Sequence, residues 1–308
     1  MRLARLVVAL TLVVTGCDTR TDAAAATSMP AASAAPSAPV GATPRLVVVG
    51  GPVTEIVFAL GAGDRVVGVD TSSQYPEATA KLPRVGYQRQ LAAEGILGLG
   101  PTRVLLTEEA GPPEAIAQLE QAGVSIVKVP GADSIAEAAA RIRVVGEALG
   151  RGEAAEVLAA DVTTRAEAAR ARAASRAPRP RALFLYARGP GTLLVGGAGS
   201  SAAALLELAG ADNAGAGLQG FAPLTAEAAS SSAPEVIVVP AKGLASLDGV
   251  DGVLRQPGLA ETPAGAARRV VGVDDLLALG FGPRLPEAID HVADALRAPP
   301  AAPGGAAR

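Results

Sequence analysis

The sequence is poor in the side chains that most often carry catalysis or bind metal ions. Its 308 residues include one Cys, one His and no Trp, and aromatic residues make up only 2%. These counts exclude catalytic schemes built on Ser-His-Asp or Cys-His. The single His also disfavours a zinc or manganese site, which would need several His, Asp or Glu ligands. Because a single cysteine forms no intramolecular disulfide, the fold must rest on its apolar core.

Other absences narrow the class of protein further. The chain has no Walker motif, and Gly196-Gly197-Ala198-Gly199 does not match the dinucleotide-binding fingerprint. The adjacent acids Glu108 and Glu109 are typical of a solvated surface. A net charge of −3, without a basic and aromatic-rich tract, argues against binding of nucleic acid. We therefore expect a binding protein rather than an enzyme.

The N-terminus has the pattern of an exported lipoprotein. Arg2 and Arg5 precede an apolar run at residues 6–14, which has the length of a secretory signal and is too short to span a bilayer. Val14-Thr15-Gly16-Cys17 then resembles a bacterial lipobox; the alternative is an uncleaved anchor followed by an incidental cysteine. We expect a signal peptide at residues 1–17, ending at a lipidated Cys17, and a flexible tether rich in Ala, Ser and Pro at residues 18–44.

The rest of the chain alternates apolar runs typical of strands with helical segments. Strands are predicted at residues 46–49, 65–69, 103–106 and 125–129, and helices at 53–60, 113–122 and 134–149. This alternation predicts an α/β fold of parallel strands with helices on both faces.

One longer helix is expected in the middle of the chain. Residues 153–177 lack Gly and Pro and would span roughly 37 Å at ~1.5 Å per residue if wholly helical. We expect an N-terminal lobe at residues 45–150, a connecting helix at 151–178, a C-terminal lobe at 179–297 and a disordered tail at 298–308.

The second half of the chain repeats motifs of the first. Leu91-Ala92-Ala93-Glu94 is followed ten residues on by Pro101, and Leu224-Thr225-Ala226-Glu227 by Pro234 at the same offset. Upstream, Val49-Gly50-Gly51 matches Val195-Gly196-Gly197, each before a helix. The repeat predicts two similar lobes with a cleft between them.

Tyr87 is the most informative candidate for a ligand-binding residue. Tyr87 and Phe221 each precede one copy of the repeated element, so they are expected on opposite walls of the cleft. Arg89 follows Tyr87 by two residues. A phenolate binds ferric iron, and a nearby guanidinium favours the phenolate. For an arbitrary Tyr-x-Arg, a hydrogen-bonded phenol and a solvated arginine would be the simpler interpretation.

Four segments give the chain a close resemblance to a known family. They are Gly51-Pro52-Val53-Thr54-Glu55-Ile56-Val57, Gly86-Tyr87-Gln88-Arg89-Gln90-Leu91, Ala110-Gly111-Pro112-Pro113-Glu114 and Leu279-Gly280-Phe281-Gly282-Pro283-Arg284-Leu285-Pro286. Over residues 45–296 the chain resembles the haem-binding periplasmic substrate-binding proteins of bacterial haem (hemin) ABC transporters. This branch belongs to the helical-backbone superfamily, which also includes binders of vitamin B12 and siderophores. The resemblance implies two Rossmann-like lobes joined by one long backbone helix, with the ligand cleft between them.

The resemblance also assigns residues to the ligand. Tyr87 would be the axial ligand of ferric haem, and Arg89 would hydrogen-bond near the ligating oxygen or the porphyrin. Some relatives add a histidine from the second lobe and hold two haems. Here the sole histidine, His291, falls in the C-terminal helix, so one haem is expected.

Further pocket residues are expected from their positions after strands. Lys242 would pair with a haem propionate, although a surface lysine is equally compatible with its position. Tyr186 and Arg188 follow a predicted strand at residues 182–185 and would line the pocket. Tyr75 is another wall candidate, for which packing in a turn is an alternative.

The permease is expected to meet one acidic residue on each lobe. Glu114 is the candidate on the first lobe, and Asp248 or Asp251 on the second. An acid near a helix N-terminus is also simply favourable for the helix dipole. The expected partners are thus ferric haem, an ABC permease dimer and the membrane holding the lipid anchor, with the protein itself a monomer. Vitamin B12 or a ferric siderophore is the alternative ligand, and a structural lipoprotein is the third option.

Overall fold

The computed structural model describes residues 44–189 and 191–299. The predicted signal peptide, Cys17 and the tether up to residue 43 lie outside the described residues, as does the expected tail from residue 300 onward. All described residues belong to one compact unit, Ala38–Arg308. Within the described residues, none of the helices combines the length and the apolar character needed to cross a membrane.

The first lobe is built on a four-stranded parallel sheet. Its strand order is β2-β1-β5-β6, and Leu46 of β1 pairs with both Val66 of β2 and Arg103 of β5. The strands are β1 (Leu46–Val49), β2 (Val66–Val69), β5 (Arg103–Thr107) and β6 (Ser125–Val129), with a separate hairpin of β3 (Gly86–Tyr87) and β4 (Gln90–Leu91). The helices are α1 (Gly51–Ala59), α2 (Ala93–Leu97), α3 (Pro113–Gln121) and α4 (Ile135–Leu149).

Both faces of this sheet are buried, as the unbroken apolar run of β1 predicts. Leu46 and Val48 pack with residues of α1 and α4, whereas Val47 and Val49 pack with residues of α2 and α3. The alternation follows from the two-residue period of a strand. The prediction of a parallel α/β lobe is confirmed.

The second lobe has a mixed sheet of order β10-β8-β7-β11-β12, in which β9 also pairs with β7. Its strands are β7 (Arg181–Ala187), β8 (Leu193–Gly196), β9 (Asp212–Asn213), β10 (Phe221–Pro223), β11 (Val236–Pro240) and β12 (Val270–Val273). Its helices are α6 (Ser201–Leu208), α7 (Ala226–Ser232), α8 (Ala241–Ser246), α9 (Gly249–Leu254), α10 (Pro263–Ala266), α11 (Asp275–Gly280) and α12 (Leu285–Ala295). Strands β9, β7, β11 and β12 are parallel, while β8 and β10 are antiparallel additions.

The sequence repeat is therefore only partly present in the fold. Strands β5 and β11 hold matching places, each following a helix of the repeated Leu-x-Ala-Glu element and pairing with the first strand of its sheet. The match of Val49 with Val195 was wrong, because Val49 ends a central parallel strand and Val195 lies in the antiparallel β8. A Val-Gly-Gly sequence marks a buried strand before a turn, but it carries no information on the pairing direction.

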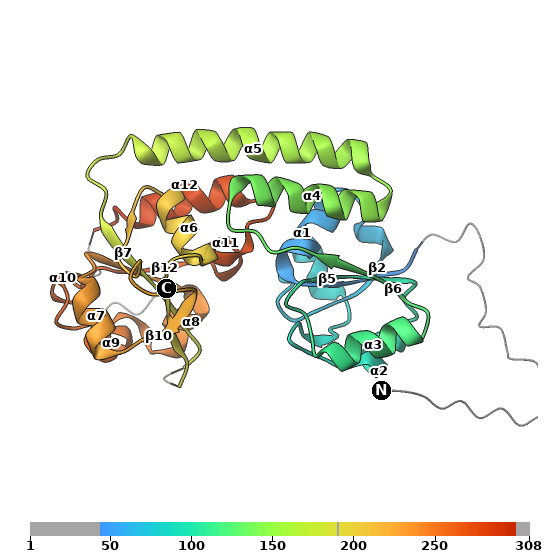
Figure 1. Cartoon of the computed structure of the whole chain (residues 1–308), viewed down its shortest axis with the longest axis horizontal. Coiled ribbons are helices and arrows are strands. Elements are labelled where there is room, and N and C mark those ends of the chain that lie inside the picture. The colour runs from blue at the N-terminus through green and yellow to red at the C-terminus, as the bar shows by residue number, and fades with distance from the viewer. Residues whose placement is uncertain (1–43, 190, 300–308) are drawn as a thin grey trace, which may run out of the picture. The chain divides into compact units, whose positions relative to one another are not determined.

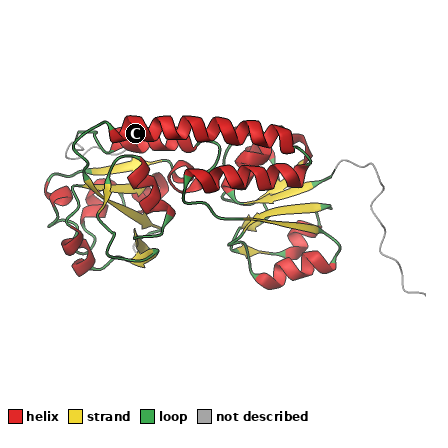
Figure 2. Cartoon of the chain, turned by 45° about the horizontal axis from the view of Figure 1, so that its top comes forward, coloured by secondary structure: helices red, strands yellow, loops and turns green. Residues whose placement is uncertain are grey.

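Helix α5 (Gly152–Ala174) connects the two lobes along their helical side (Figures 1 and 2). It ends at Ala174, earlier than the predicted ends at residues 177 and 178. Its buried residues recur at spacings of four and three: Ala155, Ala159, Val162, Ala166, Ala169 and Ala173. The first three belong to the core that includes α1 and α4, and the last three to the core that includes α6 and α12.

Small side chains bring α5 close to its neighbours. A Cβ built on Gly146 of α4 would lie only 2.1 Å from the Cβ of Ala155. On the other side, the ion pairs Arg165–Glu287 and Arg172–Asp290 link α5 to α12, and Arg176, just after α5, pairs with Asp294. One helix thus shares the cores of both lobes, which favours a fixed arrangement over a wide hinge motion.

Candidate functional site

Tyr87 lies on a short hairpin that is tied to the body of the first lobe. It ends β3 and pairs with Gln90 of β4, so Gln88 and Arg89 form a two-residue turn. The turn is held by the amide of Gly111, which donates to the carbonyl of Gln88 at 2.9 Å. The preceding Gly86 has φ +95°, a backbone conformation that favours glycine. The hairpin thereby holds a half-buried Tyr87 near the carboxyl ends of the parallel strands.

One residue of the second lobe, Arg188, contacts the Tyr87 ring, and two aromatic residues lie beside it. The guanidinium carbon of Arg188 lies 5.1 Å from the centroid of the Tyr87 ring and 5.6 Å from that of Tyr186. Tyr186 in turn makes an edge-to-face contact with Phe221, with the ring centroids 6.1 Å apart. Tyr87, Tyr186, Arg188 and Phe221 form the tyrosine–arginine cluster. The structure thus brings together residues from opposite lobes that the sequence placed on opposite walls.

Two predicted cations lie outside this cluster. Arg89 is exposed at the hairpin turn, and no hydrogen bond or ion pair involves its guanidinium within residues 44–189 and 191–299. Lys242 is exposed at the start of α8, where its backbone N–H donates to Oδ2 of Asp275 at 3.0 Å. Their roles toward a ligand remain predictions.

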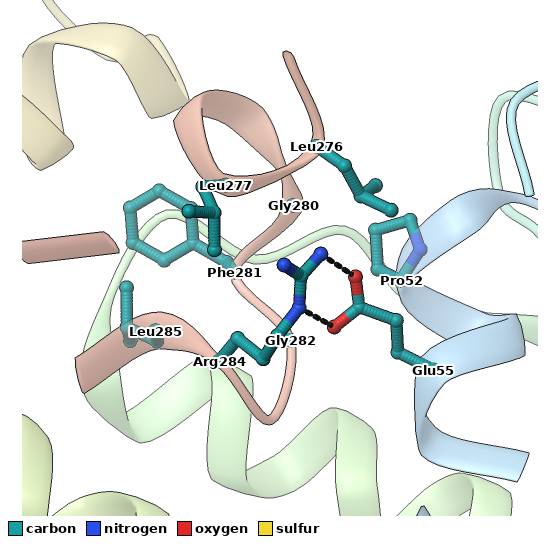
Figure 3. A pocket seen from close by; sticks show the side chains of 9 residues that line it. All are labelled: Pro52, Glu55, Leu276, Leu277, Gly280, Phe281, Gly282, Arg284 and Leu285. Atoms are coloured by element: carbon teal, nitrogen blue, oxygen red, sulfur yellow. Dashed lines mark hydrogen bonds and ion pairs between the residues drawn. The ribbon is translucent and has the colours of Figure 1, made fainter. Parts of the chain in front are cut away.

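Tyr75 takes part in a second contact between the lobes, which we call the Glu55–Arg284 junction. Arg284, just before α12, donates from Nε to Oε2 of Glu55 at 3.0 Å and from Nη2 to Oε1 at 2.5 Å. The ring centroid of Tyr75 lies 3.8 Å from the guanidinium carbon of Arg284. Figure 3 shows the ion pair beside Pro52 and Gly282. Tyr75 is 46% exposed, so it contacts this junction while part of its surface faces solvent.

The Glu55 carboxylate and the Arg284 guanidinium stabilise each other's charge, because burial disfavours both charged forms. Burial raises the pKa of the Glu55 carboxyl, while the hydrogen bond and charge of Arg284 act to lower it. Burial opposes the charge on Arg284, but its hydrogen bond to Glu55 and the negative charge there raise the pKa of Arg284 overall. A buried carboxylate without its guanidinium partner would be strongly unfavourable.

Arg141 of α4 adds a second link across the same boundary. Its Nε donates to the carbonyl of Pro130 at 2.8 Å, and its Nη1 donates to the carbonyl of Gly280 at 2.7 Å. Gly280 ends α11, where the negative end of the helix dipole favours a cation. Burial lowers the pKa of Arg141, and the charges of Glu109 and Glu137 oppose that shift.

The space at the Glu55–Arg284 junction is too small for a large ligand. The cavity drawn in Figure 3 has a volume of about 10 Å³, far below the roughly 300–1,000 Å³ of typical ligand sites. Its lining comes from α1 of the first lobe and from α11, α12 and their connecting loop in the second. We assign it a structural role, which sequence reasoning missed although it had singled out the two segments that contain Glu55 and Arg284.

The predicted docking acids differ in their surroundings. Glu114 is exposed in the first turn of α3. Asp251 is engaged with Arg268 at 2.6 Å, whereas no ion pair involves Asp248 in the described part of the chain. Asp248 precedes α9 with φ +60° and is exposed. Of the two second-lobe candidates, Asp248 is the more accessible to a partner's arginine.

Imidazole and carboxylate groups do not assemble a metal site in the described chain. His291 is exposed on α12, as the sequence predicted. Within residues 44–189 and 191–299, no group of three or more His, Cys, Asp or Glu side chains is placed to hold a metal ion.

Comparison with known proteins places the chain in a family. The model of the family described as "Periplasmic binding protein" matches residues 46–276. The chain belongs to this family of periplasmic binding proteins. This binding protein is similar to the structure of the periplasmic heme-binding protein RhuT from Roseiflexus sp. RS-1 in apo form, with 44% identity and a TM-score of 0.80. The match covers 83% of this chain and 98% of that one.

Curated relatives of the binding protein point to transport. The uncharacterized ABC transporter substrate-binding lipoprotein YvrC of Bacillus subtilis (strain 168) is 30% identical over 248 residues, which is 79% of this chain and 76% of the relative. The vitamin B12-binding protein of Vibrio vulnificus (strain YJ016) is 37% identical over 73 residues, only 24% of this chain and 27% of the relative.

Proposed function

We propose that the protein is an extracytoplasmic substrate-binding lipoprotein that captures ferric haem and delivers it to an ABC permease. The tyrosine–arginine cluster is the observation that carries the proposal, because it brings a phenol, a guanidinium and two further aromatic rings from both lobes into contact. The similarity to a heme-binding protein, 44% identical over most of both chains, supports this choice of ligand.

Tyr87 is the proposed axial ligand of the haem iron. Tyrosinate is an established haem ligand, and a nearby positive charge favours the phenolate over the phenol. The ferric iron itself would supply that charge, and Arg188 lies over the ring of Tyr87 in the ligand-free protein. Arg89, two residues further along the turn, would hydrogen-bond near the ligating oxygen or the porphyrin edge. An anionic oxygen ligand favours ferric iron, the form expected outside the cytoplasm.

The remaining cluster residues would hold the porphyrin. Phe221 is 38% exposed and, with Tyr186, presents apolar ring surface to a flat ligand. Lys242 would pair with a propionate. No covalent change in the ligand is required of any of these residues. We accordingly propose a carrier without catalytic activity, with haem as cargo.

Partners and location follow from the same proposal. Lipidation of Cys17 would anchor the protein, as a monomer, to the membrane beside its permease. Glu114 and Asp248, or Asp251 in its place, would meet permease arginines. Reversing the charge at Glu114 and Asp248 should then reduce haem uptake by cells without changing hemin affinity in solution.

A hemin titration tests the proposal. Protein lacking residues 1–17 would be titrated with hemin and followed by its Soret and charge-transfer bands, together with Tyr87→Phe and the matched control Tyr75→Phe. We expect one haem bound by the wild type and by the control. Tyr87→Phe should lose the tyrosinate charge-transfer band and bind at least ~10-fold more weakly, which corresponds to about 1.4 kcal/mol.

Two results would redirect the assignment. An absence of saturable hemin binding, or equal binding by Tyr87→Phe, would remove Tyr87 as a haem ligand. Displacement of hemin by cobalamin or by a ferric siderophore would favour the alternative cargo for the same type of importer. The match to the vitamin B12-binding protein keeps that alternative open, although it covers about a quarter of the chain.

A further inference from the structure

Arg188 lies between a tyrosine of each lobe. Its guanidinium carbon is 5.1 Å from the ring centroid of Tyr87 and 5.6 Å from that of Tyr186. The two centroids are therefore no more than about 11 Å apart, since both are measured from the same atom. Arg188 is exposed, and in the described chain no carboxylate forms an ion pair with it. Its guanidinium makes cation–π contacts with these two aromatic rings.

We propose that Arg188 is an interlobe clasp that a planar anionic ligand displaces. In the ligand-free protein the guanidinium holds the ring of Tyr87 to that of Tyr186 across the lobe boundary. When the ligand enters, the guanidinium leaves the rings and pairs with a carboxylate of the ligand. The identity of that ligand as haem rests on the proposed function, whereas the clasp in the ligand-free protein does not.

The position of Arg188 suits such an exchange. Its guanidinium lies over the rings of Tyr87 and Tyr186, and the side chain is exposed, so it can turn from the rings to a ligand that enters beside them. A ligand bound through the phenolate oxygen of Tyr87 would lie at the edge of that ring, next to the space that the guanidinium occupies. The exchange therefore needs movement of one side chain rather than of a whole lobe.

The chemistry of the exchange is favourable as well. A cation–π contact at an exposed site is weak, because water competes for the cation. A guanidinium binds a carboxylate with two parallel hydrogen bonds, which is a stronger interaction. A ligand that carries carboxylates offers Arg188 a better partner than the tyrosine rings do.

The rest of the structure keeps the lobes together while the clasp opens. The Glu55–Arg284 pair, the contact of Arg141 with Gly280 and the two shared cores of α5 do not involve Arg188. Opening of the clasp therefore frees one edge of the lobe boundary only. We expect the lobes to separate only at the edge that carries Tyr87, Tyr186 and Phe221.

The first experiment measures the ligand-free protein. Spin labels on Glu94→Cys and Glu227→Cys, exposed positions on α2 and α7, would report the distance between the lobes by pulsed electron resonance. Without residues 1–17, these are the two cysteines of the chain. Arg188→Ala should broaden the distance distribution or shift it to longer values, with the unfolding midpoint unchanged. An unaltered distribution would overturn the clasp, whether or not the protein binds haem.

The second experiment measures hemin binding by stopped flow. Arg188→Ala should associate several-fold faster, because no contact has to open, and dissociate at least ~10-fold faster, because the carboxylate partner is missing. Arg188→Lys keeps the charge without the planar fork, so it should associate as fast as Arg188→Ala but dissociate more slowly. With hemin dimethyl ester, wild type and Arg188→Ala should dissociate at equal rates. Unchanged association and dissociation in Arg188→Ala would contradict the exchange, whereas failure of the wild type to bind hemin would contradict the proposed function instead.

Discussion

Arg284 donates two hydrogen bonds to the carboxylate of Glu55, which lies 229 residues earlier in the chain. The pair joins the lobes at α1 and α12, apart from the tyrosine–arginine cluster. Arg141 supports the same boundary through the carbonyl of Gly280. The spacing of the lobes thus depends on buried charges that can be tested one at a time.

Removing the guanidinium at this junction should destabilise the fold. Arg284→Met keeps an apolar stem but leaves Glu55 as an unpaired buried carboxylate, so we expect a loss of about 3–5 kcal/mol in the free energy of unfolding. Urea denaturation of the wild type and Arg284→Met measures this loss. The double variant Glu55→Gln/Arg284→Met should recover most of the loss. If the double variant were as unstable as Arg284→Met alone, the penalty would not come from the uncompensated charge.

The same carboxyl should make stability depend on pH. Because burial raises the pKa of Glu55 above its ordinary value of 4.5, the folded protein holds this proton more tightly than the unfolded chain. The resulting stabilisation is complete below pH 4.5 and is lost as the pH rises through the folded-state pKa. Unfolding of wild type and Glu55→Gln should be compared from about pH 4 to about pH 8.

The informative quantity is the difference between those two proteins. Asp274 and Glu287, whose charges also raise the pKa of Glu55, are present in both proteins, so their own effects on stability largely cancel in the difference. The stability of the wild type relative to Glu55→Gln should decrease with rising pH and then level off. A relative stability that increases with pH would mean that Arg284 outweighs burial at this site.

Arg89 should affect ligand binding and leave folding unchanged. The side chain is exposed in a two-residue turn, so Arg89→Ala should change the free energy of unfolding by no more than about 0.5 kcal/mol. If Arg89 contacts the ligand as proposed, hemin affinity should fall by about 10- to 100-fold, as is typical for groups that support a metal ligand. Equal hemin affinity would leave Arg89 as a solvated turn residue. Lys81→Ala, another exposed cation, serves as the matched control.

The ion pairs between α5 and α12 should contribute little individually. Glu287 and Arg165 are about half exposed, so Glu287→Gln should cost no more than about 1 kcal/mol, and the cost should shrink in high salt. Phe281 is 2% exposed in the neighbouring core, and Phe281→Ala should cost about 3–5 kcal/mol at any salt concentration. Urea denaturation of Glu287→Gln and Phe281→Ala at low and high salt distinguishes the two contributions. A comparable loss from both variants would show that these pairs behave as buried charges.

Much of the fold was predictable because it depends on local patterns. The buried run of residues 46–49 and the Ser134 cap before α4 each specify their element within a few residues. The side chain of Ser134 accepts from the amide of Glu137, as a helix N-cap does. The long helix was visible from the lack of Gly and Pro, although its last turn ends earlier than that pattern alone indicates.

The contacts between lobes were not predictable in the same way. Nothing near Arg284 in the sequence indicates that its partner is Glu55. The expectation that Arg188 lines the pocket does not specify that its guanidinium lies over the ring of Tyr87. Contacts of this kind depend on the relative placement of the two lobes, which is set by the packing of α5 against both. The pairing direction of β8 was missed for a similar reason, since a short apolar run specifies a strand but not its neighbour.

The distribution of tyrosines has an optical consequence. The chain has no Trp and three Tyr, so its intrinsic near-ultraviolet emission comes from Tyr75, Tyr87 and Tyr186. Each ring lies against an arginine that belongs to one of the two lobe contacts: Tyr75 against Arg284, and the other two against Arg188. Unlabelled protein therefore carries its own fluorophores at the tyrosine–arginine cluster and at the Glu55–Arg284 junction. Replacing Tyr75 by Phe would leave a signal that reports on the tyrosine–arginine cluster alone.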